Sequence, residues 1–220
     1  MSATAAPLTL TDRDRAMLAG DFGPAPRLAL AIIVRMAAVY GATELLDITA
    51  AHIDSTVYIG EAGLEFAERL ADRGLVIPPA QVVPPGVRLT YRRLVRWGEI
   101  AYIAGHGPTD GEGWGSKLGK VGRDVTVAEA VAAAQLTALN VLGTIERELG
   151  DLDSVACWLK VNGYVHAVDG FTEHATVVNG FSDLLVDLYG EERLAARTSV
   201  GVPHLPFDMP VEVDAVVALR

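Results

Sequence analysis

The chain has 220 residues, a net charge of −10 at pH 7 and an isoelectric point near 4.9. It contains no run of five or more lysines and arginines, so its composition argues against nucleic acid as a partner bound through its phosphates. Hydrophobic residues make up 50% of the chain, which suffices for one core with a smaller block attached.

Two features of the sequence bear on where the protein works. Cys157 is the single cysteine and cannot form an internal disulfide, as expected in a reducing compartment. The apolar run 28–34 is far shorter than the roughly 20 residues of a membrane span, and residues 1–12 lack the basic start and cleavage site of a signal peptide. We therefore expect a cytoplasmic protein with no membrane partner.

The first part of the chain mixes helical and extended patterns. It predicts helices over 8–23, 24–40 and 61–73 and a strand over 45–49, with Thr11 as the first helix cap. Beyond it, residues 77–86 are rich in proline and have neither helix nor central-strand character. We place the domain boundary there, between a block of residues 1–76 and a domain of residues 77–220.

Several motifs in the first block carry a resemblance. They are Leu-Thr-Asp-Arg-Asp-Arg-Ala-Met-Leu-Ala-Gly20, Tyr-Gly-Ala42, Ala-His-Ile-Asp54 and Glu-Ala-Gly-Leu-Glu-Phe66. In these the block is similar to the start of aconitase X enzymes, which are much longer, so residues 1–76 are interpreted as an aconitase-X-like fragment. His52 is interpreted as a structural or loop residue, and a part in substrate binding is the alternative.

The second domain has the element order β-β-α-β-α-β-β. A hairpin is predicted over 89–96 and 100–104, and a loop over 107–124. Thr126 opens a capping box before a helix that runs to Gly150. A strand, a helix ending at a glycine and two final strands follow. This order predicts an α+β fold, a mixed sheet with both helices on one face.

The C-terminal strands place charged groups near one another. In the last strand, an apolar row alternates with Glu212 and Asp214, so the period of two puts both carboxylates on one face. Arg197 lies on the preceding strand, before a return connection containing Pro203 and Pro206. We therefore expect Arg197 and Glu212 to face one another.

The second domain also carries family motifs. They are Tyr91, Ala-Gly105, Asn179-Gly180, Ala-Arg-Thr-Ser199 and Val-Glu-Val-Asp-Ala215. In these, residues 76–220 resemble the YjgF/RidA family of enamine/imine deaminases. The resemblance implies a chorismate-mutase-like fold assembled as a homotrimer, with active sites between subunits. The trimer would cover the second face of the sheet, which carries either Val211, Val213 and Val217 or their opposite row.

The same resemblance assigns roles to residues. Arg197 would hold the carboxylate of the substrate, since a guanidinium grips a carboxylate bidentately, and Glu212 would transfer protons. The implied substrate-binding residues are Tyr91, Gly105, Asn179 and Ser199. From residue types alone, an ion pair of Arg197 with Glu212, with Asp214 or with an acid of a neighbouring subunit is an equal alternative. For Asn179 a hydrogen bond to the helix backbone is an equal alternative, and Asp214 is expected at a rim or subunit contact. The sequence departs from the family at Ala104, where serine is usual, and at Thr198-Ser199, where Ser-Cys is common.

Neither a metal nor a cofactor is expected. The histidines at 52, 106, 166, 174 and 204 are dispersed, without the spacing of metal ligands. Hydrolysis of an imine needs a positioned water and an acid or base, because a protonated C=N group is already electrophilic.

The sequence thus predicts a hydrolytic deaminase of small reactive enamine/imine carboxylates that releases ammonia and a keto acid. A non-catalytic small-molecule (carboxylate) binding or assembly module is the alternative, and the acidic chain disfavours ribonuclease activity. The fused fragment fits the first reading, because some aconitase X relatives dehydrate hydroxyprolines to cyclic imino acids, which an imine-handling domain would receive.

Overall fold

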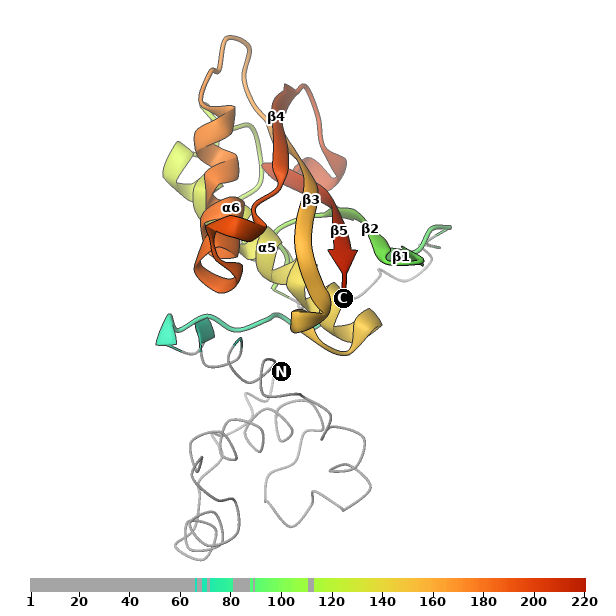
Figure 1. Cartoon of the computed structure of the whole chain (residues 1–220). Helices are drawn as coiled ribbons and strands as arrows, with labels where there is room; N and C mark the ends of the chain where they lie inside the picture. Colours follow the sequence, from blue (N-terminus) through green and yellow to red (C-terminus); the bar gives the residue numbers. More distant parts are fainter. Residues whose placement is uncertain (1–65, 67–68, 71, 81–87, 89, 111–112) are drawn as a thin grey trace, which may run out of the picture. The chain divides into compact units, whose positions relative to one another are not determined.

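The computed structural model describes residues 66, 69–70, 72–80, 88, 90–110 and 113–220, which Figure 1 draws in colour. The compact unit to which they belong spans Glu65–Arg220. The elements predicted between residues 8 and 49, His52 and most of the helix predicted over 61–73 lie outside the described residues.

A five-stranded sheet forms the middle of this unit. Its strands lie side by side in the order β1-β2-β5-β3-β4, and β3 and β4 are parallel whereas the other neighbours are antiparallel. The strands are β1 (Leu94–Trp97), β2 (Ile100–His106), β3 (Val155–His166), β4 (Ala196–Val202) and β5 (Val211–Leu219). The predicted mixed sheet is confirmed, and its central strand is the last in the chain.

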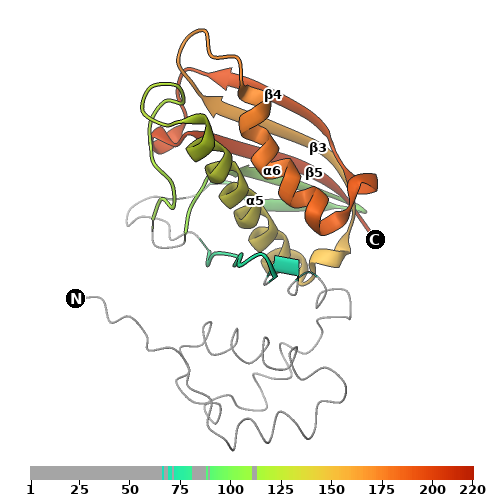
Figure 2. The ribbon, with the colours of Figure 1, turned by 90° about the vertical axis from the view of Figure 1, so that its left-hand side faces the viewer.

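Two long helices of the described residues, α5 (Val127–Leu149) and α6 (His174–Tyr189), cover one face of the sheet, as Figure 2 shows. Helix α5 begins at the predicted capping box, in which the Glu129 N–H donates to the Thr126 hydroxyl and the Thr126 N–H donates to the Glu129 carboxylate. This helix is long and apolar enough to cross a membrane, but most of it is buried inside the unit, as in the core of a soluble domain.

The two helices approach each other closely at Gly180. A Cβ atom at this position would lie 2.1 Å from the carbonyl oxygen of Val131 on α5, so only glycine fits without movement of the backbone. The contact fixes α6 against α5 and thereby fixes the side chains that α6 presents to the edge strand β4.

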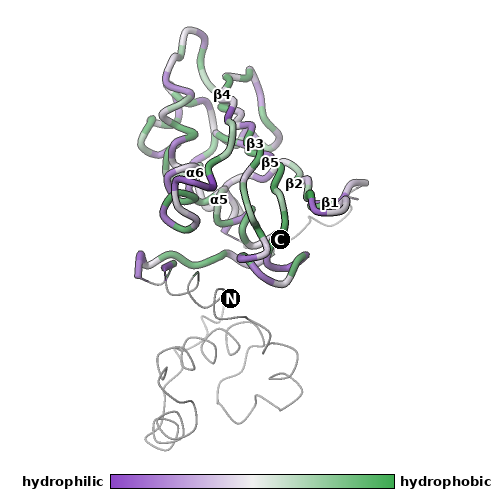
Figure 3. Tube along the Cα trace, viewed as in Figure 1, coloured by the Kyte–Doolittle hydropathy of each residue, from purple (hydrophilic) through white to green (hydrophobic). Residues whose placement is uncertain are grey.

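The sheet has a helix face and an open face, which points away from the helices. In β5, Val211, Val213, Ala215, Val217 and Leu219 are buried toward the helices, and the residues between them are half-buried on the open face. The predicted period of two is confirmed, and the apolar C-terminal half of β5 is green in Figure 3.

The open face also carries exposed apolar side chains. Register places Val95, Trp97, Tyr102 and Val200 on it, with 45%, 80%, 52% and 40% of their surface exposed. The sequence left open which row of β5 lacks cover. The structure shows that the row of Val211 lies under the helices, so the open face is the surface that a further copy of the chain would have to cover.

The core extends beyond the strands toward the N-terminus. Phe66 and Leu70 are buried in it, and the Phe66 ring lies 4.6 Å from the Tyr189 ring between centroids. Arg73 pairs with Asp187 of α6 at 3.1 Å. These residues precede the predicted boundary at 76, which stays a prediction, but they pack with the second domain.

Candidate functional site

Arg197 lies on the edge strand β4 and points to the helix face. Its guanidinium donates to the Ser182 hydroxyl at 2.8 Å, to the Asn179 side-chain oxygen at 2.9 Å and to the Ala175 carbonyl at 3.3 Å. All three acceptors belong to α6. The helix therefore holds the arginine in one orientation at the edge of the sheet.

The partners of Arg197 are uncharged. Among the described residues it forms no ion pair, and burial lowers the pKa of its guanidinium, an effect that the nearby Asp183 carboxylate opposes. The ion pair with Glu212 or Asp214 that the residue types allowed is absent within the described chain. A half-buried cation with neutral partners retains the capacity to bind an anion such as a carboxylate.

Glu212 lies on β5 and points to the open face. Its carboxyl group sits over Gly105 of β2, where a Cβ atom would come within 1.9 Å of Oε1. Glycine at position 105 thus leaves room for a close approach, as the sequence suggested, and a larger residue would displace the Glu212 carboxyl group. Burial raises the pKa of the Glu212 carboxyl, and the Asp214 carboxylate raises it further.

A buried histidine fixes the backbone beside Gly105. His106 Nδ1 donates to the Ala104 carbonyl at 2.7 Å, and its Nε2 accepts from the Thr144 hydroxyl of α5 at 2.8 Å. Burial chiefly lowers the pKa of His106 to about 4. The imidazole is thus neutral at physiological pH and ties the end of β2 to α5.

Asp214 shares the open face with Glu212. Its carboxylate accepts from the Asn162 side-chain amide at 2.8 Å and from the Tyr164 hydroxyl at 2.9 Å, both on β3. The hydrogen bond to Asp214 is the main reason that the pKa of Tyr164 is raised. Asp214 was expected as a rim or subunit-contact charge, and within the chain it is the acceptor of two hydrogen bonds.

Arg197 and Glu212 do not face one another within one chain, so that expectation is wrong. Glu212 pairs with Tyr164, whereas Arg197 pairs with Val161. Residues 161 and 164 point to opposite faces of β3, because side chains alternate along a strand. Strand β3 also lies between β4 and β5, which separates them by two strand spacings, about 10 Å.

The other predicted residues are placed as follows. Asn179 contacts Arg197, which favours the pocket over the helix-backbone alternative. Ser199 is half-buried on β4 in register with Gly163 and shares the helix face with Arg197. Tyr91 precedes β1, is 55% exposed, and has no described hydrogen bond to Arg197 or Glu212. The structure thus joins Arg197 with Asn179, and Glu212 with Gly105, as two separate groups.

Sequence reasoning missed Ser182, Asn162 and Tyr164. Ser182 follows Asn179 by three residues, so both lie on one side of α6, and this spacing was the available signal. The two residues of β3 lie in Lys-Val-Asn-Gly-Tyr164, which resembles a branch of the family, but their contact with Asp214 was missed because the register of β5 with β3 is not readable from the sequence.

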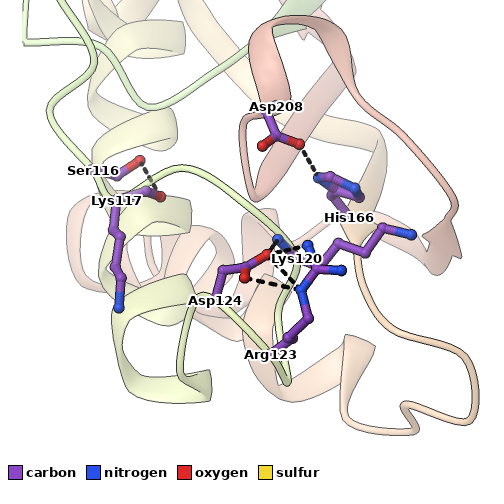
Figure 4. A network of polar contacts seen from close by, with 7 residues as sticks. All are labelled: Ser116, Lys117, Lys120, Arg123, Asp124, His166 and Asp208. Carbon is purple, nitrogen blue, oxygen red and sulfur yellow. Dashed lines mark hydrogen bonds and ion pairs between the residues drawn. The ribbon is translucent and has the colours of Figure 1, made fainter.

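A network of polar contacts connects the loop around Lys120 and Asp124 with His166 and with the segment around Asp208 (Figure 4). The Asp124 carboxylate accepts from the Lys120 N–H at 2.9 Å and from the Arg123 guanidinium, which keeps the pKa of Asp124 low, at about 2. His166 Nδ1 lies 3.4 Å from Asp208 Oδ1, and the Gly119 N–H donates to the Asp208 carbonyl at 2.7 Å. The network holds the connection that leads into β5 and Glu212. Within the described residues, no group of three or more His, Cys, Asp or Glu is arranged to hold a metal ion.

Comparisons with known proteins divide the chain into two parts. Residues 94–217 match the family described as YjgF/chorismate mutase-like, putative endoribonuclease, and residues 7–92 match the aconitase X first domain. A crystal structure of Atu1372 from Agrobacterium tumefaciens, of unknown function, has a TM-score of 0.67 and 34% identity, and covers 76% of this chain and 99% of that one.

Two curated relatives each match part of the chain. Protein TCP17 of Trypanosoma cruzi is 40% identical over 143 residues, which are 64% of this chain and 87% of that protein. Cis-3-hydroxy-L-proline dehydratase of Pseudomonas aeruginosa is 57% identical over 61 residues, which are 28% of this chain. The chain spans only 10% of the length of that dehydratase.

Proposed function

The chain belongs to the YjgF/chorismate mutase-like family, and from that premise we propose that it is a hydrolytic deaminase of small enamine and imine carboxylates. The observation that carries the proposal is the state of Arg197. It is a half-buried guanidinium, oriented by three neutral acceptors and unpaired with any described carboxylate. Such a group suits the bidentate capture of a substrate carboxylate.

The second catalytic group in this proposal is Glu212. Because it lies on the opposite face of the sheet from Arg197, one chain cannot present both groups to one substrate. We place each site between two subunits, with Arg197 from one copy and Glu212 over Gly105 from the next. The exposed apolar side chains of the open face support such an assembly, and a homotrimer is the arrangement we propose.

The proposed reaction needs only water and proton transfer. With the carboxylate held by Arg197, water adds to the carbon of the C=N group and the nitrogen takes a proton. Glu212 then gives a proton to the nitrogen of the tetrahedral adduct, the C–N bond breaks, and the C=O bond forms as the hydroxyl loses its proton. An acyclic imine yields ammonia and a keto acid, whereas a cyclic imine opens to an amino keto acid.

The aconitase X match suggests a cyclic substrate. The relative named as a cis-3-hydroxy-L-proline dehydratase is similar over 61 residues, and the aconitase X first domain matches residues 7–92 of this chain. Removal of water from a 3-hydroxyproline leaves an enamine that tautomerises to a cyclic imine carboxylate, which is the class of substrate proposed here. The family description as a putative endoribonuclease receives less support, since the net charge of −10 opposes RNA binding.

The test is an assay with 2-iminopropanoate and with a pyrroline carboxylate, followed as keto-acid formation above the spontaneous rate. Arg197→Lys keeps the positive charge but loses the two parallel N–H donors of the guanidinium that bind a carboxylate bidentately. We therefore expect turnover to fall on the order of tenfold or more. Arg193→Lys is the matched control, since Arg193 lies outside strand β4 near Asp153 and should leave turnover unchanged.

A wild-type protein that does not accelerate either reaction would contradict the proposal. The alternative, a carboxylate-binding module without turnover, is favoured if calorimetry then shows pyruvate binding that Arg197→Lys weakens. The Arg197 group supports that alternative, because its partners come from a single chain.

A further inference from the structure

The two carboxylates on the open face have different surroundings. Asp214 accepts two hydrogen bonds, from Asn162 and Tyr164, whereas the carboxyl group of Glu212 accepts none from the described residues. The two side chains are neighbours on one side of β5, since they are two positions apart in the strand.

Hydrogen bonds of this kind stabilise the ionised form of a carboxylic acid. Asp214 is therefore the member of the pair whose carboxylate is held by donors of the same chain. The half-buried Glu212 has no donor to stabilise its charge and lies near the Asp214 carboxylate. A carboxyl group in such surroundings is favoured in its protonated form.

We propose that Asp214 is a positioning residue: held beside Glu212 by Asn162 and Tyr164, its carboxylate keeps the proton on Glu212. This role rests on the proposed function, in which Glu212 gives its proton to the leaving nitrogen. It explains why Tyr164, directly opposite Glu212 in the sheet, donates its hydroxyl to Asp214 instead.

The titratable groups that act on Glu212 from the described residues are few. On its own strand the group is Asp214, and on β3 it is Tyr164. On the other side β2 presents Gly105, which has no side chain. Within one chain, a change at Asp214 therefore alters the surroundings of the Glu212 carboxyl group without touching Glu212 itself. In the proposed assembly Arg197 of the next copy also faces Glu212, and this group is the same in the variant and the wild type.

The experiment is a titration of Asp and Glu carboxyl carbons by ¹³C NMR on the full chain, which needs no turnover. In Asp214→Asn, the amide oxygen can still accept from Tyr164, but the negative charge is gone. We expect the titration midpoint of Glu212 to move to lower pH relative to the wild type. Asp169→Asn, which removes an exposed loop carboxylate, is the control and should leave that midpoint in place.

A second variant tests the role of the hydroxyl group. Tyr164→Phe removes one of the two donors that hold the Asp214 carboxylate, so the Glu212 midpoint should again move to lower pH, by less than in Asp214→Asn. Turnover measured against pH should follow: its fall at high pH should move to lower pH in Asp214→Asn. A Glu212 midpoint that is unchanged in both variants would overturn the proposal. The midpoints could also move as expected while neither the wild type nor any variant hydrolyses an imine. In that case the role of Asp214 in keeping the proton on Glu212 is supported, and the proposed function is contradicted.

Discussion

The helix face and the open face of the sheet differ in how many hydrogen-bond partners they give to their charged side chains. On the helix face, Arg197 finds its acceptors in α6 of the same chain, and its surroundings are complete. On the open face, Glu212 lies over Gly105 and accepts no hydrogen bond from the described residues, and the same face exposes Trp97 and Tyr102 further along the strands. Under the proposed function, the difference means that the fold of one chain orients the cation that would bind substrate, whereas the proposed proton-transfer group would depend on assembly.

The largest expected effect concerns the open face. Glu212→Gln keeps the volume of the side chain but cannot exchange a proton, so turnover should fall by roughly 10². Because Glu212 has no ion pair with Arg197 in the chain, the melting temperature should change little. Turnover and thermal melts should be measured on one preparation. A variant that melts much earlier, with normal turnover in its folded fraction, would assign Glu212 to structure and not to chemistry.

A smaller effect is expected from the apolar rim of the same face. Trp97→Asp puts a charge on a side chain that is 80% exposed in the single chain and that assembly would bury. We expect weaker assembly by sedimentation velocity and a parallel loss of turnover on dilution, while the fold measured by circular dichroism is retained. Trp97→Phe, which keeps an apolar ring, is the control. Unchanged assembly in Trp97→Asp would remove this rim from the subunit contact.

The smallest effect on turnover at neutral pH is expected for His106, which joins the two faces through β2 and α5. The pKa of His106 is about 4 in the folded protein, whereas the ordinary value for a histidine side chain is 6.5. The unfolded chain therefore binds the extra proton between pH 6.5 and pH 4, so the free energy of unfolding falls with falling pH over this window, by about 3 kcal/mol, and is unaffected above it.

Urea unfolding at fixed protein concentration measures this effect. His106→Gln removes the titrating group, so the variant should lose that part of the decline between pH 6.5 and pH 4, while the contributions of the carboxylates remain. Identical pH dependence in the two proteins would mean that His106 is not a buried neutral group.

The sequence predicts what depends on local pattern. The alternation in β5 separated its two rows of side chains, Thr126 and Glu129 marked the start of α5, and the family motifs directed attention to Arg197 and Glu212. Which row faced the helices was open, because a period of two distinguishes the faces of a strand but does not say which one is covered.

The rest depends on strand order and register. Strands β4 and β5 follow one another in the chain, and neighbours in sequence usually pair. Here β5 enters between β2 and β3, so Arg197 and Glu212 were brought together in the prediction and are apart in the fold. The approach of Glu212 to Gly105 also depends on an irregular register between Ile103 and His106, which no local pattern reveals.

The most direct test of the account is complementation between two inactive variants. Arg197→Ala retains Glu212, and Glu212→Gln retains Arg197, so in mixed oligomers some subunit contacts join the two intact groups. After the variants are dissociated and reassembled together in equal amounts, random assembly predicts recovery of about a quarter of wild-type imine hydrolysis. The same variants mixed without subunit exchange should stay inactive. If the reassembled mixture also stays inactive although mass spectrometry shows mixed oligomers, the site does not lie between subunits and the account is contradicted.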